Sequence, residues 1–268
     1  MSIVIITIPG EAKRTFANSL HSLTGGKVDL VIIQKRKSNH NSIFGRLGRL
    51  YKAVGLWNLP KEILYAILLR VNGERKFLEY FRERDETVFY DSTEYEYKPK
   101  ILEVYSINSD EVLDTLQELS PDLMVIWGST IIKPDILKTA KRAINLHMGL
   151  CPHYRGAIAN QFAVIDKEPN KIGATIHYAA DKVDSGEILE TIGVDTTKPP
   201  RDLFRDLNNR AEKRYLEIAH KLSQNEQIES RPQDAFVGKT PLLKNWTPST
   251  RYSLARQLMR WEKTGSLD

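Results

Sequence analysis

Three polar side chains, those of Asn145, His147 and Asp184, have the types and spacing that acyl transfer requires. Asn145 and His147 lie two residues apart, next to or on the short apolar run Ala143–Leu146. If that run is a strand, residues two apart point to the same face, so the amide and the imidazole converge on one point. Asp184 lies in the sequence Val-Asp-Ser-Gly, which is typical of a tight turn between two strands. The turn places a carboxylate where it can reach the other two side chains.

The chemistry that suits these three groups is the transfer of an acyl group to an amine. A transferred acyl group passes through a tetrahedral state with a negatively charged oxygen, and the Asn145 amide is a suitable donor to that oxygen. The imidazole of His147 titrates near neutral pH, so it is suited to take the proton that an attacking amine loses. A carboxylate at Asp184 would fix the tautomer and the position of the imidazole.

Five short motifs surround these residues. They read Asn145-Leu-His147, Leu150-Cys-Pro152, Tyr154-Arg155-Gly156, Gln161-Phe162-Ala163 and Val183-Asp184-Ser185-Gly186-Glu-Ile188. Together they resemble the folate-dependent formyltransferases, a family that moves a formyl group from 10-formyltetrahydrofolate to an amine. N-x-H alone means little, but its combination with P-x-Y-R-G and a later D-S-G-x-I is hard to produce by chance. The resemblance is good over residues 100–195 and implies that Asn145, His147 and Asp184 are catalytic.

The segment Val125–Pro134 is similar to the strand and loop that line the folate pocket of that family. The resemblance implies that 10-formyltetrahydrofolate is the co-substrate. Its expected contacts are Trp127, Gly128, Ser129, Ile131, Ile132 and Val183. The expected substrate contacts are His153, Tyr154, Arg155 and Gly156. No metal is expected, because the single cysteine and the scattered histidines lack the spacing of metal ligands.

Three positions depart from the family pattern. A Ser often follows the His by two positions, and this chain has Gly149 there. The usual Trp after the Gln is Phe162, and the usual Pro two positions before the Gln is Ala159. None of these changes removes a catalytic atom, so their effect is expected on the shape of the acceptor pocket.

Each residue of the predicted site also has a structural interpretation. A lone histidine on an apolar run is usually a core residue, and a lone aspartate in a turn is usually solvated; the neighbouring motifs favour the catalytic interpretation here. Arg155 and Gly156 either shape a turn or, through the guanidinium, hold a phosphate or carboxylate. Cys151 lies near His153, but no third group orients the two. A buried structural thiol is therefore favoured over a nucleophile.

The order of apolar runs predicts an α/β fold. Strands at Ile3–Ile8 and Val28–Ile33, with a helix at Glu11–Leu23 between them, predict a parallel sheet with right-handed crossovers. Further strands are expected at 101–105, 122–127, 144–147, 173–178 and 187–192, and further helices at 111–119, 202–223 and 251–261. The expected class is a Rossmann-like, mostly parallel sheet with helices on both faces, the formyltransferase fold. The catalytic pair would lie at the carboxyl end of the fifth strand, where such sheets bind ligands.

The expected domain division is a catalytic domain over residues 1–200 and a small helical or dimerisation extension over residues 201–268. A helical insertion is expected at about residues 40–98, with two helices within 59–85 that are separated at Asn72-Gly73. In front of these helices, the stretch Lys35–Lys52 carries Lys and Arg but no acidic residue. It either grips phosphates or forms a solvated loop and helix face.

Composition indicates an ordinary globular enzyme of 268 residues with one cysteine, a net charge of +5 and a pI of about 9.1. A chain of this length forms a core without disulfides. The first apolar run has six residues, too few for a signal peptide or a membrane span, so a cytoplasmic protein is expected. The basic amphipathic segment Arg251–Trp261 is expected to be a packing or dimer element.

The expected acceptor follows by elimination. Formylation of methionyl-tRNA implies, by family resemblance, a separate β-barrel domain, whereas 68 residues follow Pro200 and begin with a helical pattern. Purine-pathway relatives carry a glycine-rich phosphate loop after the first strand, and Ile8-Pro9-Gly10-Glu11 makes a poor phosphate nest. The chain therefore looks like the nucleotide-sugar N-formyltransferases that modify amino sugars for surface glycans. The expected partner is a nucleotide-linked amino sugar, with a homodimer and neither a membrane nor a nucleic acid.

Three alternatives to this acceptor and activity remain open. They are a methionyl-tRNA formyltransferase-like enzyme, a formyltetrahydrofolate hydrolase with water as the acceptor, and a non-catalytic folate- or sugar-binding module. Retention of all three polar residues argues against the last.

Overall fold

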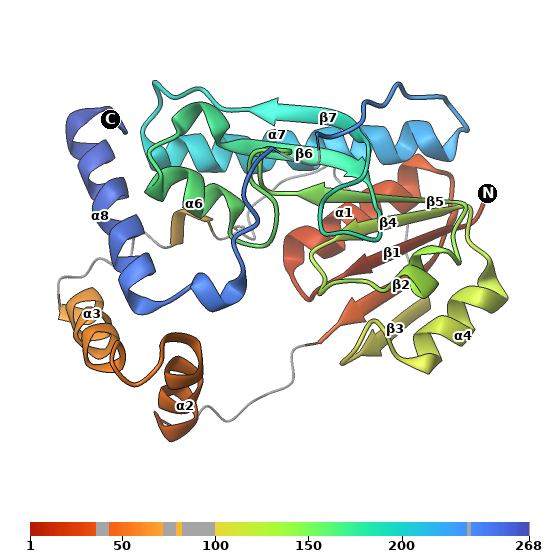
Figure 1. Cartoon of the computed structure of the whole chain (residues 1–268). Helices are drawn as coiled ribbons and strands as arrows, with labels where there is room; N and C mark the ends of the chain where they lie inside the picture. Colours follow the sequence, from red (N-terminus) through yellow and green to blue (C-terminus); the bar gives the residue numbers. More distant parts are fainter. Residues whose placement is uncertain (36–42, 72–78, 82–99, 235–236, 268) are drawn as a thin grey trace.

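The computed structural model of the protein describes residues 1–35, 43–71, 79–81, 100–234 and 237–267. Its centre is a seven-stranded sheet with the order β3-β2-β1-β4-β5-β6-β7 (Figure 1). The first five strands pair in parallel, and β6 and β7 are antiparallel to their neighbours. The strands are β1 Ile3–Thr7, β2 Val28–Gln34, β3 Lys100–Val104, β4 Leu123–Trp127, β5 Arg142–His147, β6 Gly173–Tyr178 and β7 Ile188–Gly193. The expected mostly parallel α/β sheet is confirmed.

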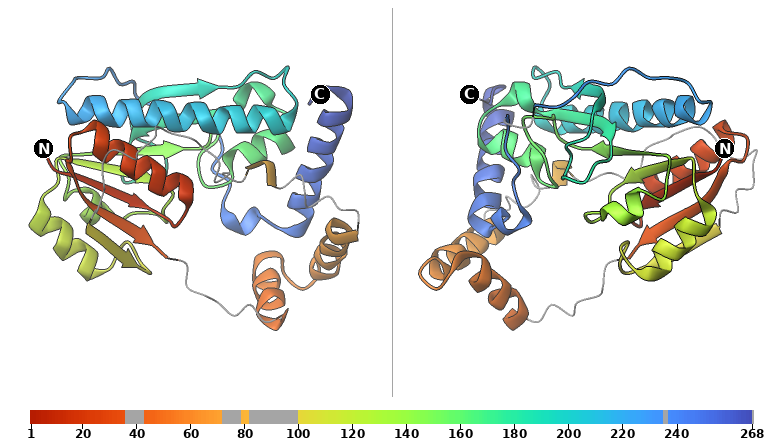
Figure 2. Two further views of the ribbon diagram at one scale, coloured as in Figure 1. Left: turned by 180° about the vertical axis from the view of Figure 1, so that it is seen from behind. Right: turned by 45° about the vertical axis from the view of Figure 1, so that its right-hand side comes forward.

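The strands supply side chains to two apolar cores, one on each face of the sheet. In β1, Ile3 and Ile5 belong to one core, and Val4 and Ile6 belong to the other. Successive side chains of a strand point to opposite faces, so both faces have to be covered by helices. The covering helices are α1 (Glu11–Leu23) and α7 (Pro200–Ser223) on one face, and α4 (Asp110–Leu119) and α5 (Pro134–Leu137) on the other (Figure 2).

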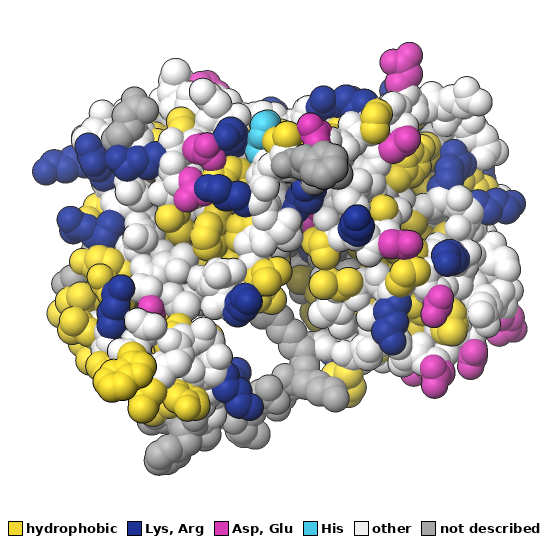
Figure 3. All heavy atoms as spheres, viewed as in Figure 1, with side chains coloured by type: hydrophobic (Ala, Val, Ile, Leu, Met, Phe, Trp, Pro, Cys, Tyr) yellow, Lys and Arg dark blue, Asp and Glu magenta, His cyan; other side chains and the backbone are white. Residues whose placement is uncertain are grey.

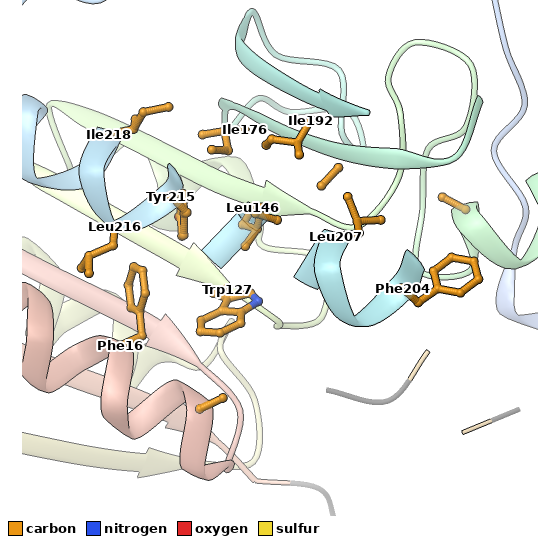
Figure 4. Packing of buried hydrophobic residues seen from close by; sticks show 14 of the residues in the cluster. Phe16, Trp127, Leu146, Ile176, Ile192, Phe204, Leu207, Tyr215, Leu216 and Ile218 are labelled. Carbon is orange, nitrogen blue, oxygen red and sulfur yellow. The ribbon is translucent and has the colours of Figure 1, made fainter. Parts of the chain in front are cut away.

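The long helix α7 is fixed to the middle of the sheet by Tyr215. The buried hydroxyl accepts a hydrogen bond from the Ile126 N–H (2.9 Å) and lies 2.8 Å from the Ile126 carbonyl and 2.9 Å from the Ile144 carbonyl. The Tyr215 ring stacks on Phe16 with 5.4 Å between the centroids, and Phe16 meets Trp127 edge-on (Figure 4). The core therefore runs without a break from β1 into α7. Apolar residues on both sides of residue 200 belong to this core, and the domain division at that residue stays a prediction.

The insertion contains two described helices, α2 (Ile43–Val54) and α3 (Leu59–Val71). Both lie away from the sheet, and α3 packs on the C-terminal helix α8 (Pro248–Thr264), as Figures 1 and 2 show. Helix α8 also packs on α6 (Ala159–Ile165), so it connects the insertion to the segment between β5 and β6. Of the two helices predicted within residues 59–85, α3 is the first. Where the second is predicted, the structure describes only residues 79–81, which form a short 3-10 turn.

The described part of the basic stretch forms a loop start and most of α2. Lys35 makes an ion pair with Glu103 of β3, and the Lys52 side chain is exposed on α2. No helix of the described residues has the length and apolarity to cross a membrane.

Candidate active site

The predicted catalytic residues meet at the carboxyl end of β5. Asn145 and His147 leave the same face of this strand, which pairs with β4 on one side and β6 on the other. In the antiparallel register with β6, Asn145 is opposite His177 and His147 is opposite Thr175. Directly opposite side chains in such a pair lie on the same face, so four polar groups are brought to one spot.

Asp184 reaches this spot from the loop between β6 and β7. Its Oδ1 lies 3.2 Å from the Asn145 amide nitrogen, and its Oδ2 lies 3.3 Å from His147 Nδ1. The backbone N–H of Gly156 donates to the same Oδ2 at 2.8 Å. The backbone of Asp184 is left-handed (φ 47°), a conformation that Asp and Asn tolerate better than other non-glycine residues. The turn therefore selects the residue type at this position as well as placing its carboxylate.

The carboxyl group of Asp184 is held in its ionised form. Burial alone would raise its pKa, but the facing His147, the contacts with His177 and the Gly156 N–H together outweigh burial. The pKa of Asp184 consequently lies well below its usual range. A permanent negative charge at this point can orient an imidazole and stabilise its protonated form.

His147 is buried between two hydrogen-bond acceptors. Its Nδ1 faces Asp184, and its Nε2 lies 3.0 Å from the carbonyl oxygen of Tyr154. Burial lowers the pKa of His147 below the ordinary imidazole value, and the Asp184 charge and the Tyr154 carbonyl only partly offset burial. The ring is therefore neutral at pH 7 but lies in surroundings that stabilise an added proton. This combination suits a group that accepts a proton during a reaction.

His177 is a further member of the site that the sequence interpretation missed. Its Nδ1 lies 2.7 Å from the Tyr178 carbonyl, so Nδ1 carries a hydrogen, while Nε2 faces the Asn145 amide nitrogen at 3.2 Å. His177 Nε2 also lies 3.4 Å from Asp184 Oδ1. The available signal was the alternation Thr175, Ile176, His177, which places two polar side chains on one face of β6.

The loop after β5 is closely packed around His147. A Cβ added to Gly149 would lie 2.3 Å from His147 Nε2 and 2.4 Å from the Ala159 Cβ. Thr175 holds this loop, because its hydroxyl donates to the Gly149 carbonyl (2.7 Å) and accepts from the Cys151 N–H (2.9 Å). The departure from the family's Ser at position 149 therefore has a local cause: this arrangement of the histidine leaves no room for a side chain there.

A cavity of about 400 Å³ opens beside these residues. Asn145, His147, His177 and Asp184 line it, and Phe204 and Asn208 reach it from the first turns of α7. All the residues predicted to contact the folate also line it: Trp127, Gly128, Ser129, Ile131, Ile132 and Val183. The strand end of β4 and the loop before β7 thus form two walls of one cavity, with the polar group of residues at the junction.

Of the four residues predicted to contact substrate, Gly156 lines the cavity and the other three lie outside it. The Arg155 guanidinium is buried and donates to the Gln233 side chain (3.2 Å) and to the carbonyls of Asp234 (3.0 Å) and Val237 (3.3 Å). These internal acceptors come from residues far along the chain, which the motif alone does not reveal. Arg155 therefore holds Gln233, Asp234 and Val237 against the site.

Tyr154 and His153 have structural contacts in the same loop. The buried Tyr154 ring directs its hydroxyl to Asp166 (2.6 Å) and Glu168, away from the cavity, while its carbonyl contacts His147. The His153 carbonyl accepts a hydrogen bond from the Lys239 N–H at 2.8 Å. Tyr154 thus contributes to the site through its backbone carbonyl, which contacts His147, and not through its side chain.

Cys151 has the properties of a structural thiol. It is buried, and its Sγ lies 3.5 Å from the Asp184 carbonyl oxygen. Burial, together with the Asp184 charge, raises the pKa of the thiol to about 12, so a thiolate does not form at neutral pH. Within the described ranges, no group of three or more His, Cys, Asp and Glu side chains is arranged to hold a metal ion.

Comparison with known sequences gives a family. A family model described as "Formyl transferase" matches residues 81–219, which is more than half of the chain. A methionyl-tRNA formyltransferase of Syntrophus aciditrophicus is 29% identical over 163 residues, which are 59% of this chain and 51% of that protein. The chain thus spans about half the length of the curated relatives that it matches.

Comparison with solved structures finds the same fold. A sugar N-formyltransferase from a Shewanella species matches with a TM-score of 0.54 and 15% identity, over 95% of this chain and 88% of that one. An N-formyltransferase from Helicobacter canadensis, in complex with folinic acid and dTDP-3-aminofucose, matches with a TM-score of 0.50 and 14% identity, over 91% of this chain and 72% of that one. At such low identity these likenesses show the fold alone. The family match, the fold and the residues gathered at the end of β5 agree, and the chain belongs to the formyl transferase family.

Proposed function

We propose that the protein is an N-formyltransferase that moves a formyl group from 10-formyltetrahydrofolate to the primary amine of a nucleotide-linked amino sugar. The observation that carries this proposal is that Asn145 and His147 both contact Asp184, and that all three residues line one cavity. The three groups are an amide donor, a neutral imidazole and an ionised carboxylate. They are the groups that formyl transfer to an amine needs, and Asp184 contacts both of the others, at 3.2 Å to Asn145 and 3.3 Å to His147.

The cavity fits a flat, partly polar ligand such as the pterin end of a folate. Its walls are mostly apolar, with Trp127, Ile132 and Leu137 among the lining residues. Four of its polar side chains are in contact around Asp184: Asn145, His147, His177 and Asp184 itself. Ligand pockets commonly combine apolar walls with a few convergent polar groups. The residues that would hold the folate are those at the end of β4 and in the loop before Asp184. When bound, 10-formyltetrahydrofolate supplies the formyl carbon.

In the proposed reaction the chain's own residues manage charge and a proton. The Asn145 amide exchanges one of its two internal contacts, with Asp184 or His177, for the formyl oxygen as that oxygen gains negative charge. His147, neutral at pH 7, takes a proton from the attacking amine, and the resulting imidazolium lies 3.3 Å from the ionised Asp184. The protonated ring stabilises the charged oxygen and then returns the proton to the leaving nitrogen. No covalent bond to the chain is required.

A small-molecule acceptor is supported by the size and lining of the cavity. Among the described residues that line the cavity, Lys182 is the one Lys or Arg. Recognition of an RNA backbone generally relies on several cationic contacts to phosphates. The described residues after β7 form helices α7 and α8, both packed on the catalytic core. Two enzymes of similar fold add to this support: the Shewanella protein is a sugar N-formyltransferase, and the Helicobacter protein was solved with dTDP-3-aminofucose bound.

A methionyl-tRNA acceptor is the second candidate, because the curated relatives found by sequence carry that name. The two candidates are separated by one panel: 10-formyltetrahydrofolate with several nucleotide-linked amino sugars, with methionyl-tRNA and with no acceptor. Formylation of a sugar, traced by mass, is the expected result. Formylation of methionyl-tRNA alone contradicts the sugar proposal, and folate turnover without any acceptor indicates a hydrolase. Full activity in His147→Ala contradicts the assigned site whatever the acceptor.

A further inference from the structure

Helix α3 has two opposite apolar faces, and the described residues cover only one of them. The covered face carries Glu62 and Leu69, which are buried where α3 packs on α8. The opposite face carries Ile63, Leu64, Ile67 and Val71, whose spacing follows the helical repeat. We call these four residues the outer face of α3. A helix that is apolar on all sides is usually buried on all sides, so the exposure of this apolar face is unusual.

The outer face of α3 is exposed and continues into the turn before the helix. Ile63, Leu64, Ile67 and Val71 are 37%, 54%, 52% and 74% exposed. In the turn between α2 and α3, Leu56 is 63% exposed and Trp57 is 94% exposed. Figure 3 shows apolar side chains gathered over this part of the molecule, at the lower left. A contiguous apolar patch of this kind on a globular protein marks a surface that binds something.

Among the described residues of α2 and α3, the exposed charged side chains next to this surface are basic. On a helix of 3.6 residues per turn, Lys61 and Arg70 fall on the two borders of the outer face of α3, and both side chains are exposed. Helix α2 adds the exposed Lys52. The single acidic residue between Ile43 and Val71 is Glu62, and its carboxylate is turned away into the contact with α8. The surface is therefore apolar with a basic border.

The surface is held in place by the contacts of the opposite face. The Glu62 carboxylate accepts hydrogen bonds from the Ser249 N–H (2.8 Å) and the Ser249 hydroxyl (2.5 Å) at the first turn of α8. One turn along α3, the rings of Tyr65 and Tyr252 pack with 5.0 Å between their centroids. These contacts fix the rotation of α3 about its axis, so the apolar residues point outward from a firm base.

We propose that the outer face of α3, with Leu56 and Trp57, rests on the surface of a bilayer that contains anionic lipids. Apolar side chains enter the boundary between headgroups and acyl chains, Trp prefers that boundary, and Lys and Arg at the border meet anionic headgroups. A second copy of the chain is a poorer occupant, because a self-complementary contact would bring basic borders of the same sign together. This inference departs from the sequence-based expectation of no membrane partner, which concerned spans. It is independent of the acceptor proposed above.

The first test is co-sedimentation of the full chain with vesicles of equimolar phosphatidylglycerol and phosphatidylcholine, compared with vesicles of phosphatidylcholine alone. The expected result is binding to the anionic vesicles that weakens at high salt. Ile67→Ser should weaken this binding at least about fivefold, on the order of the loss of one interfacial anchor. The matched control is Ile101→Ser on β3, where the isoleucine is 54% exposed, close to the 52% of Ile67; it should bind as the unmodified chain does. Equal weakening in both variants, or no binding to anionic vesicles, overturns the proposal.

Charge reversal and fluorescence provide a second test. Lys61→Glu should weaken binding to the anionic vesicles about fivefold or more, whereas Lys138→Glu, at the exposed end of α5, should not. The emission of Trp57 should shift to the blue on binding, and Trp57→Phe should remove that shift while most of the binding remains. If the chain instead forms a dimer in solution that Ile67→Ser dissociates, a second copy occupies the surface and the bilayer proposal is wrong.

Discussion

The end of β5 and the outer face of α3 differ in which side chains they bury and which they expose. At the end of β5, four polar groups are buried or half-buried, and each has a partner within the chain: Asn145, His147, His177 and Asp184. On α3, four apolar side chains are exposed, and the described residues offer them no partner. The polar groups at the end of β5 already have partners within the chain before a ligand binds. A ligand therefore has only to replace some of these internal hydrogen bonds. Helix α3 is held in place by the contacts of its opposite side with α8, and its outer face is available for contact with a bilayer.

The largest effects are expected from changes to the polar region. His147→Ala and Asp184→Asn should each lower kcat/KM for formyl transfer about 100- to 10,000-fold. The first change removes the proton-transfer group, and the second removes the charge that orients it. Asn tolerates the left-handed backbone at position 184, so Asp184→Asn removes the charge without straining the turn. The control is His220→Ala near the far end of α7, which should retain activity. Steady-state kinetics with circular dichroism of each variant separate chemistry from folding.

A smaller effect is expected from crowding the histidine. Gly149→Ala should lower kcat/KM about tenfold and destabilise the fold by about 1–3 kcal/mol, because the added Cβ would lie 2.3 Å from His147 Nε2. Gly193→Ala is the matched control, since no heavy atom lies within 4 Å of the Cβ that it would add. Both variants are compared by kinetics and by urea unfolding. If the activity of Gly149→Ala is unchanged, the His147 ring can move away from the added methyl group and the prediction is wrong.

The pH dependence tests the charge states of the pair. Because burial lowers the pKa of His147, the ring should remain neutral from pH 8 down to about pH 6.5, and kcat/KM should fall only as the pH drops through its lowered pKa. The unfolded chain binds that proton at a higher pH than the folded chain does, so folding stability also decreases in acid. In Asp184→Asn the fall in residual activity should move to lower pH, because the carboxylate no longer raises the pKa of His147. If kcat/KM instead changes above pH 7 because His147 titrates there, this explanation is wrong.

An effect on stability alone is expected at Tyr215. Tyr215→Phe leaves the Ile126 N–H without its side-chain acceptor at a buried point, which should lower the free energy of unfolding by about 1–3 kcal/mol. The exposed Tyr105 provides the control, and Tyr105→Phe should change stability by less than about 0.5 kcal/mol. Urea unfolding curves measure both.

The smallest effect is expected from a change on the outer face of α3, and it tests whether this face is independent of the site at the end of β5. Ile67→Ser should change kcat/KM in solution by less than about twofold and stability by less than about 0.5 kcal/mol, since the side chain is already half in water. If activity in solution falls with this change, the insertion takes part in catalysis and the two regions are not independent. The measurement uses the same assay as the His147 and Asp184 variants.

The sequence allowed more to be predicted about the candidate active site than about the insertion. Long buried strands such as Leu123–Trp127 have a strong apolar pattern, and Asn145 and His147 share a face by simple alternation. His177 was missed because its place depends on the antiparallel pairing of β5 with β6, which no local pattern reveals. Arg155 was interpreted as a substrate contact, although its partners lie about eighty residues further on. Long-range partners of this kind are set by tertiary packing.

The hydrogen bonds between Glu62 and Ser249 join residues that are 187 positions apart. During synthesis, α3 therefore leaves the ribosome long before α8 exists to receive it. At about 5–20 residues per second, α3 waits about 10 to 40 seconds with both of its apolar faces in water. The anchoring of the insertion is consequently one of the last events of folding, and chains that end before Ser249 release an unsupported apolar helix into the cell.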